Sequence, residues 1–376
     1  MVSMRLSPRE REIIALLRAQ PTLDAAGIAR ILGTSKGAVA VALSSLTQKG
    51  EIVGRGYLLR GEPAAVVIGG AVWDIKAMSN QAIHLHTSNP STVARTPGGV
   101  GRNIAENLAR LGARVQLIAA IGTDPAGREL LARTSEAGVD VGQVVFSPHP
   151  TGSYLAALDA DGELVVGLSD MLATDSLDIA AIARSQDLIE QAAVVVLDGN
   201  LPAAVIEWAL AVAAVAEVPV VLEPVSVAKA ERLAPVLGPQ RPVYAIKPNL
   251  DELGALIGGA VADDDAAIVT AARTLRSRGV SYVWVSRGAG GSLLVGPEDV
   301  VSAPARPVDV VDVTGAGDAM TAGFVQGLMN GLDAVSAVRR GRIAAELTVA
   351  SAQTVRSDLG VAFTQALDVE DQGVTR

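Results

Sequence analysis

One segment, residues 312–323 with the sequence DVTGAGDAMTAG, places glycines and carboxylates at the expected start of a helix. Its glycines allow a tight turn and leave backbone N–H groups open to an anion. Asp318 could accept a proton from a substrate hydroxyl. The amides of Gly315, Ala316 and Gly317 would then stabilise the charge on a transferring phosphoryl group. The segment equally fits a glycine-rich turn in which Asp caps the helix, so local chemistry leaves two interpretations open.

A second glycine-rich segment, residues 96–112 with the sequence TPGGVGRNIAENLARLG, leads into an amphipathic helix. Gly98 and Gly99 would let the backbone approach a ligand closely, or they serve helix–sheet packing. Asn103 offers a donor and an acceptor to sugar hydroxyls, whereas Arg102 is expected as a solvated cation at the helix start. Neither a Walker sequence nor a complete G-x-G-x-x-G fingerprint occurs in the chain. A bound phosphate is therefore not held by a P-loop.

Polar residues also follow three other expected strands. Asp74 comes after the first strand, where its carboxylate could accept hydrogen bonds from a vicinal diol or could cap a turn. In the string KPNLDE, Asn249 and Glu252 stand three residues apart. They could reach a hydrated Mg²⁺ ion that bridges nucleotide phosphates, or they could cap the following helix. A glycine loop suited to a nucleotide follows a later strand and contains Ser286, Gly288 and Gly291.

The elements that would position these residues are those of a parallel α/β protein. The 376 residues are 49% hydrophobic, 19% charged and 3% aromatic, which is typical of a globular protein with helices packed on a buried sheet. Apolar runs at residues 64–70, 115–120, 194–197, 218–222, 244–246 and 282–286 alternate with helical patterns. This alternation predicts a βα-wound sheet with helices on both faces. Residues 152–170 instead predict a β-hairpin that forms a lid over the ligand crevice.

Composition excludes or disfavours several kinds of site. The chain has no cysteine, which rules out disulfides, thiolate zinc sites and a cysteine nucleophile. His84, His86 and His149 are too few and too scattered to predict a metal site or a triad, although His84 and His86 alternate like one face of a strand. No signal-peptide pattern or uninterrupted membrane span is found, so we expect a cytoplasmic protein with no membrane partner.

The first 60 residues differ in charge from the rest. They contain nine Lys or Arg and four Asp or Glu, a formal charge of +5, whereas residues 61–376 carry −14. Ser7, followed by Pro8 and Glu10, is a helix-start signature. Two more helical stretches, at residues 23–32 and 35–49, and an expected hairpin at residues 51–60 follow.

This order of elements resembles a winged helix-turn-helix. The resemblance implies a DNA-binding domain at residues 1–60, with Ser35 and Lys36 of the third helix in the major groove and Arg55 of the wing near phosphate or the minor groove. A small helical module used for dimerisation or packing is the alternative, because the third helix is rich in Ala and Val.

The order and spacing of TPGGVGRN, NLDE, SRGAGG and DVTGAGDAMTAG resemble the ribokinase-like (PfkB) carbohydrate and nucleoside kinases over residues 64–355. The resemblance implies a three-layer α/β/α sandwich at residues 61–376, with a small β lid formed by residues 76–96 and 150–170. It implies ATP and Mg²⁺, with Asp318 as the base for a primary hydroxyl. It also implies a monovalent cation, for which K⁺ is the candidate, beside Asp312 and Thr314.

Within that family, the strings TSNP, LDGNL and EPVS and the expected lid resemble the pseudouridine kinases. This implies phosphorylation of the 5′-hydroxyl of pseudouridine. The residues implied around the substrate are Asp74, Gly98, Gly99 and Asn103 for the ribose, and Ser153 and Asp170 for the base. A kinase for another ribosyl compound and a ligand-sensing transcriptional regulator are the alternatives. By analogy with lidded kinases and winged-helix proteins, we expect a homodimer.

Overall fold

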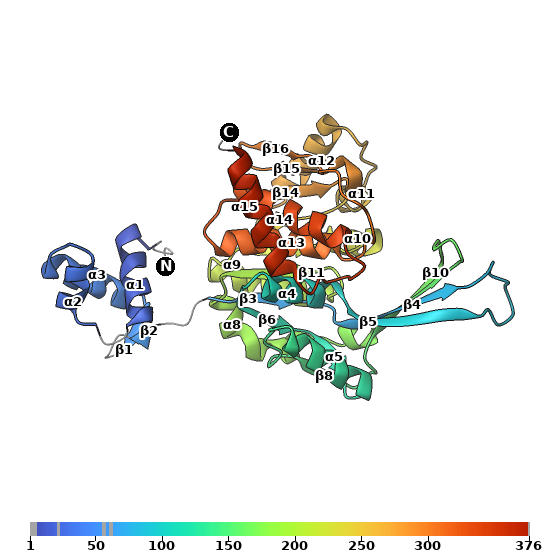
Figure 1. Ribbon diagram of the computed structural model, residues 1–376, viewed down its shortest axis with the longest axis horizontal. Helices are drawn as coiled ribbons and strands as arrows, with labels where there is room; N and C mark the ends of the chain where they lie inside the picture. The colour runs from blue at the N-terminus through green and yellow to red at the C-terminus, as the bar shows by residue number, and fades with distance from the viewer. Residues whose placement is uncertain (1–5, 21–22, 55–57, 60–62, 375–376) are drawn as a thin grey trace. The chain divides into compact units, whose positions relative to one another are not determined.

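The computed structural model describes residues 6–20, 23–54, 58–59 and 63–374 (Figure 1). The chain divides into two compact units, Met1–Pro63 and Ala64–Arg376. In the described residues no single helix is long and apolar enough to cross a membrane. Two short helices, α2 (Ala25–Ile31) and α3 (Lys36–Gln48), reach that length and composition only as a pair bent by 114°.

In its described part, the smaller unit contains three helices and two short strands. The first helix, α1 (Pro8–Ala19), begins at the predicted cap, where Ser7 and Glu10 form a capping box. The strands β1 (Ile52–Gly54) and β2 (Leu58–Leu59) pair antiparallel. Buried apolar residues of α1, α2, α3 and β1 form the core of the unit. Glu10 also accepts hydrogen bonds from Lys49 and Ser45, each at 2.8 Å, and so ties α1 to the end of α3.

The larger unit is built on an eight-stranded sheet. Six strands run parallel in the order β6 (Val115–Ile118), β3 (Ala65–Ile68), β11 (Val194–Asp198), β12 (Val220–Glu223), β13 (Val243–Ile246) and β14 (Val280–Ser286). They coincide with the six apolar runs of the sequence, which confirms the predicted parallel arrangement. Two strands that the apolar runs do not predict, β15 (Ser292–Val295) and β16 (Val300–Ala303), extend the sheet antiparallel beyond β14.

Helices cover both faces of this sheet, because alternate side chains of its strands point to opposite sides. Val66 and Ile68 pack in a core with α9 (Ala203–Val215), α10 (Val227–Leu233), α11 (Leu250–Ile257) and α12 (Asp265–Ser277). Ala65 and Val67 pack in a second core with α4 (Val100–Arg110), α13 (Ala316–Met329), α14 (Ala334–Val349) and α15 (Leu359–Val374). The larger unit therefore has the predicted three layers (Figure 1).

A second, four-stranded sheet projects from the main sheet of the larger unit (Figure 1). Its strand order is β10 (Leu164–Asp170), β9 (Ser153–Leu158), β4 (Val72–Ser79) and β5 (Ser91–Gly98). The central pair, β4 and β9, is parallel, and the outer pairs are antiparallel. The predicted hairpin supplies β9 and β10. We call this sheet the lid.

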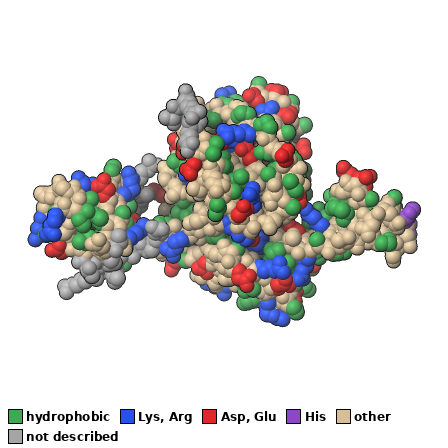
Figure 2. Space-filling model, viewed as in Figure 1, with side chains coloured by type: hydrophobic (Ala, Val, Ile, Leu, Met, Phe, Trp, Pro, Cys, Tyr) green, Lys and Arg blue, Asp and Glu red, His purple; other side chains and the backbone are tan. Residues whose placement is uncertain are grey.

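The loop between β4 and β5 carries His84 and His86, and a histidine marks the free end of the lid (Figure 2). The expectation that these histidines lie on a strand is wrong. The side chain of Asn89 closes the loop instead, since it accepts from the His84 N–H at 2.8 Å and donates to the His84 carbonyl at 2.9 Å.

Shorter elements link the lid to the main sheet. Two three-residue strands, β7 (Ala120–Gly122) and β8 (Val145–Ser147), pair in parallel on either side of α5 (Pro125–Glu136) in the sequence. Three short helices, α6 (Leu172–Asp175), α7 (Ile179–Ile182) and α8 (Gln186–Glu190), lead from β10 to β11.

Candidate active site

The glycine-rich segment forms the start of α13. Gly315 caps the helix with φ 81°, and an added Cβ would overlap the carbonyl oxygen of Thr354, so only glycine fits. The amide of Ala316 donates to the Val313 carbonyl at 3.2 Å and is already used in a turn. Among the described residues none accepts the amides of Gly315 and Gly317. Two of the three predicted anion-binding amides therefore remain open to a ligand.

Asp318 lies in the first turn of α13 and is only 9% exposed. Burial raises the pKa of Asp318 from 3.8 to about 7, although a hydrogen bond from Asn103 opposes the rise. Asn103 Nδ2 donates to Asp318 Oδ2 at 2.8 Å. A carboxylate with a pKa near neutrality can take a proton from an alcohol and release it again, as a general base must.

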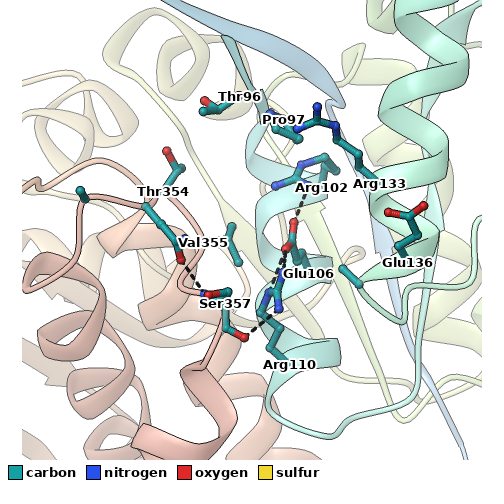
Figure 3. A pocket seen from close by; sticks show the side chains of 13 residues that line it. Thr96, Pro97, Arg102, Glu106, Arg110, Arg133, Glu136, Thr354, Val355 and Ser357 are labelled. Atoms are coloured by element: carbon teal, nitrogen blue, oxygen red, sulfur yellow. Dashed lines mark hydrogen bonds and ion pairs between the residues drawn. The ribbon is translucent and has the colours of Figure 1, made fainter. Parts of the chain in front are cut away.

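Arg102 fixes the orientation of the Asn103 amide. Its Nη2 donates to Asn103 Oδ1 at 2.7 Å, so the amide nitrogen must face Asp318. Arg102 is 1% exposed and pairs with Glu106, which also binds Arg110 in the next turn of α4 (Figure 3). The expectation of a solvated Arg102 is wrong, because Glu106 neutralises the guanidinium inside the protein.

A cavity of about 440 Å³ lies beside this row of charges on α4 (Figure 3). It is lined by the end of β5, by α4, by the end of α5 and by residues 352–357. Arg102 Nε in its wall has no hydrogen-bond partner among the described residues. None of the residues predicted for substrate, nucleotide or cations lines it. The predicted binding residues therefore do not form the cavity, although Arg102 in its wall hydrogen-bonds to Asn103.

Asp74 projects from β4 beside the two glycines of the second segment. Gly98 leaves room for it, since an added Cβ there would overlap the Asp74 carboxyl group. Gly99 has φ 91° and packs against Gly70 so closely that a Cβ would lie 2.5 Å from its carbonyl oxygen. Burial raises the pKa of Asp74 from 3.8 to about 6, opposed by Arg102 and Lys76. No described residue hydrogen-bonds to the Asp74 carboxylate, which leaves it free to accept from a diol.

A buried carboxylate that the sequence patterns do not single out, Asp198, holds two of these loops together. Its Oδ2 accepts the amide of Gly70 at 2.9 Å and that of Gly101 at 2.8 Å. Asp198 ends β11, whereas Gly70 follows β3 and Gly101 lies in the first turn of α4. The string LDGNL contains it, yet only the fold shows that it joins three segments.

Lys247 is another functional residue that sequence reasoning missed. Its Nζ lies 3.0 Å from Glu223 Oε2, which also accepts from Thr321 Oγ1 at 2.9 Å. A Cβ added to Gly317 would lie 3.4 Å from Lys247 Nζ, so the ammonium stands beside the open amides of α13. Burial alone would lower the pKa of Lys247, but attraction to Glu223 outweighs it and keeps the group charged. In the sequence, the signal for Lys247 was its place at the start of the string KPNLDE, directly after an expected strand.

Asn249 and Glu252 form a capping box at the start of α11. Asn249 Oδ1 accepts the Glu252 amide at 2.9 Å, and Glu252 Oε2 accepts the Asn249 amide at 3.0 Å. The described residues contain no cluster of three or more metal-binding side chains. Since Mg²⁺ usually keeps several waters and binds few protein oxygens, the second oxygen of Glu252 fits a hydrated ion. The cap and the predicted ion site are compatible.

The predicted nucleotide loop lies next to this capping box. Ser286 ends β14, and its backbone bridges to Asn249. Gly288 and Gly291 have φ values of 54° and 80°, and a Cβ on Gly291 would overlap the Ala303 carbonyl. The loop therefore needs glycine for its own conformation, whatever it binds.

The remaining predicted residues lie around the lid and in the smaller unit. Ser153 and Asp170 face each other in the β9–β10 register. Asp312 and Thr314 contact Lys76 of β4. Ser35 caps α3 and Lys36 begins it, and both are exposed, whereas Arg55 lies outside the described residues.

Comparison with known proteins shows the family to which the chain belongs. A model of the pfkB family carbohydrate kinases matches residues 63–359. The uncharacterized sugar kinase YeiI of Escherichia coli (strain K12) is 36% identical over 330 residues, which cover 87% of this chain and 89% of that protein. The pseudouridine kinase of the same strain is 34% identical over 308 residues, or 81% of this chain and 96% of that protein.

Solved structures agree with the fold. A carbohydrate kinase from Agrobacterium tumefaciens superposes with a TM-score of 0.69 at 30% identity, covering 81% of this chain and 97% of that structure. The ribokinase of Arabidopsis thaliana complexed with ribose and ATP superposes with a TM-score of 0.70 at 23% identity, covering 81% and 99%. The chain thus belongs to the pfkB family of carbohydrate kinases and is an ATP-dependent sugar or nucleoside kinase.

Proposed function

We propose that this kinase phosphorylates the 5′-hydroxyl of pseudouridine. The proposal is supported by two carboxylates that both act on buried Arg102. One is Asp318, whose pKa is raised to about 7, and the other is Asp74 of β4, to whose carboxylate no described residue hydrogen-bonds. Asp74 suits the vicinal diol of a ribosyl group. The similarity to a pseudouridine kinase supports the choice of nucleoside.

In the proposed reaction, Asp74 accepts hydrogen bonds from the ribose hydroxyls and Asn103 donates to the ribose or to the base. Asp318 takes the proton from the 5′-hydroxyl as the hydroxyl oxygen attacks the γ-phosphorus of ATP, and the bond from that phosphorus to the β–γ bridging oxygen breaks to release ADP. The amides of Gly315 and Gly317, together with the Lys247 ammonium, stabilise the negative charge on the transferring group.

Nucleotide contacts are proposed for the loop that contains Ser286, Gly288 and Gly291. Mg²⁺, held through water by Asn249 and Glu252, would neutralise charge on the nucleotide phosphates. Both groups lie at the carboxyl edge of the parallel sheet, where ligands of open α/β sheets bind.

Base recognition is proposed for the root of the lid. Pseudouridine has an N1–H donor, which uridine lacks because its N1 carries the sugar. Asp170 and Ser153 offer oxygens that could accept this hydrogen bond. A site that binds this donor favours pseudouridine over uridine, which cannot make the bond. Asp170 is exposed and Ser153 is half-buried in the structure, so the bound nucleoside itself would cover the acceptor.

A substrate panel tests the proposal. ATP consumption is measured with pseudouridine, uridine, adenosine and ribose, and we expect kcat/KM to be at least about tenfold higher for pseudouridine than for uridine. Asp170→Ala removes the acceptor oxygens and should lower the ratio of the kcat/KM for pseudouridine to that for uridine, while ribosyl binding persists. A preference for ribose or adenosine would contradict the substrate assignment and leave the kinase assignment intact.

We further propose that the smaller unit binds DNA. Its formal charge of +5 over residues 1–60 and the exposed Ser35 and Lys36 at the start of α3 support this. Fluorescence anisotropy of the full chain with random duplex DNA, with and without nucleoside, measures it. Binding that is equal in Lys36→Glu and in the unchanged chain would contradict the assignment.

A homodimer that pairs through the lid is also proposed. All of β10 is exposed, including Leu164, Val165, Val166 and Leu168. Exposed apolar strands are usually covered by a partner. Light scattering coupled to size exclusion should give a dimer mass for the unchanged chain and a monomer mass for Leu168→Glu; a monomeric unchanged chain would contradict the proposal.

A further inference from the structure

Lys76 connects the lid to the segment that leads into α13. It lies in β4, and its Nζ is 2.8 Å from Asp312 Oδ2 and 3.2 Å from Thr314 Oγ1. The other oxygen of Asp312 accepts the Thr314 amide at 2.8 Å. The side chains of Lys76 and Asp312 are 39% and 27% exposed, so solvent screens this pair only in part. The Lys76 ammonium group thus contacts both side chains of the turn formed by residues 312–314.

The turn that Lys76 contacts leads directly into Gly315 at the start of α13. Thr314 directly precedes Gly315, whose open amide faces the anion site and whose Cα packs on the Thr354 carbonyl. Lys76 lies two residues beyond Asp74, so both side chains leave the same face of β4. The favourable effect of the Lys76 charge on ionised Asp74 agrees with this closeness. Docking of the lid and shaping of the anion site therefore share one ion pair.

The same two residues are those that the family resemblance implies for a monovalent cation, and the structure does not fit that ion. Lys76 already brings a unit positive charge to the side chains of Asp312 and Thr314. A second cation at these oxygens would meet the ammonium at contact distance, where like charges repel.

We propose that Lys76 is a built-in replacement for the monovalent cation, a positioning residue that makes the kinase independent of added K⁺. The lid lysine holds the loop before Gly315 in its anion-binding shape. Closing the lid and completing the anion site then become one event, because the charge arrives on β4. Of the two tests, the measurement of activity depends on the proposed kinase reaction, whereas the measurement of thermal unfolding does not.

Potassium dependence tests the proposal. The unchanged chain, Lys76→Met and Lys76→Arg are assayed in KCl and in choline chloride at equal ionic strength. We expect the kcat/KM of the unchanged chain to differ less than about twofold between the salts, because the ammonium already supplies the charge. Lys76→Met should lose about tenfold or more in choline and recover in KCl. Lys76→Arg should remain independent of K⁺.

Thermal unfolding supplies the second readout and needs no substrate. KCl should raise the Tm of Lys76→Met relative to choline chloride and leave the Tm of the unchanged chain in place; Asp312→Asn in the Lys76→Met background should remove the response. Two results would overturn the proposal. One is strong activation of the unchanged chain by KCl, which needs no variant. The other is a loss in Lys76→Met that is equal in both salts, which would mean that Lys76 touches the phosphoryl group itself.

Discussion

The Asn103–Asp318 hydrogen bond should set the pH dependence of the reaction. Asp318 has a pKa of about 7 and must be ionised to act as a base, so kcat/KM should rise with pH. At pH 6 about a tenth of the enzyme is active, and at pH 8 about nine tenths, if the pKa of the free enzyme controls the rate. The acidic limb should therefore have a midpoint near neutrality.

Asn103→Ala removes the donor that stabilises ionised Asp318. A hydrogen bond to a charged group contributes about 1.5–3 kcal/mol. One pKa unit corresponds to about 1.4 kcal/mol, so the midpoint should move alkaline by about one to two pH units. The rate at high pH should also fall, because Asn103 is proposed to bind the substrate, but the midpoint is independent of that loss.

The assay is kcat/KM against pH from 5.5 to 9.5, in buffers of equal ionic strength, for the unchanged chain and two variants. Asn107→Ala is the matched control. Asn107 lies one turn further along α4, is fully buried and makes no side-chain hydrogen bond to a described residue. Its midpoint should stay near that of the unchanged chain. An Asn103→Ala midpoint that stays in place, or moves to lower pH, would refute the reasoning.

Four further outcomes follow from the contacts of single residues. Asp318→Asn should lower kcat by roughly 10²–10⁴; it should also raise Tm at pH 8, because a carboxyl whose folded pKa is raised loses stability as pH rises from 3.8 through about 7. Gly315→Ala should lower kcat by about 10² or more, because its Cβ overlaps the Thr354 carbonyl and displaces an anion-binding amide. Asp198→Asn should destabilise the fold by about 1–3 kcal/mol in denaturant titration, since it leaves an amide N–H unpaired. Glu10 has a pKa lowered to about 2, chiefly by its lysine partner; the hydrogen-exchange protection factors of α1, which correct for the intrinsic exchange rate at each pH, should fall as pH falls from 4.5 to 2 in the unchanged chain and lose that pH dependence in Glu10→Gln.

The central sheet could be predicted because its strands are buried on both faces and appear as unbroken apolar runs. The same principle explains why no apolar run marks β16 and β5, but it does not explain β15, whose four residues are all buried. Residues 300–303 of β16 alternate between exposed and half-buried, and six of the eight residues of β5 are exposed. Strands that face solvent carry little apolar signal, so pairing with a neighbour rather than composition decides their structure.

The site divides in the same way. Asp318 and Asn103 could be proposed from the sequence because glycine-rich segments contain them, and Asp74 because it follows the first apolar run. Lys247 and Asp198 could not, since each acts on a segment that only the fold brings near. Arg102 was expected to be exposed because arginine is charged. It is buried instead, because Glu106, one helical turn further along α4, pairs with it. The type of a residue predicts which chemistry its side chain can do, but the residues that the fold brings near it determine whether the side chain is buried, paired or free.

The strand order of the lid determines when its strands can pair during synthesis on the ribosome. The hairpin of β4 and β5 can pair as soon as it is synthesised, but the other edge of β4 waits for β9, which follows only after β6, α5 and β8. During that interval a half-made lid presents an unpaired edge, a template for wrong partners. A pause in translation between β5 and β9 would leave the edge of β4 unpaired for longer. The yield of folded enzyme should therefore depend on how fast the segment between β5 and β9 is translated.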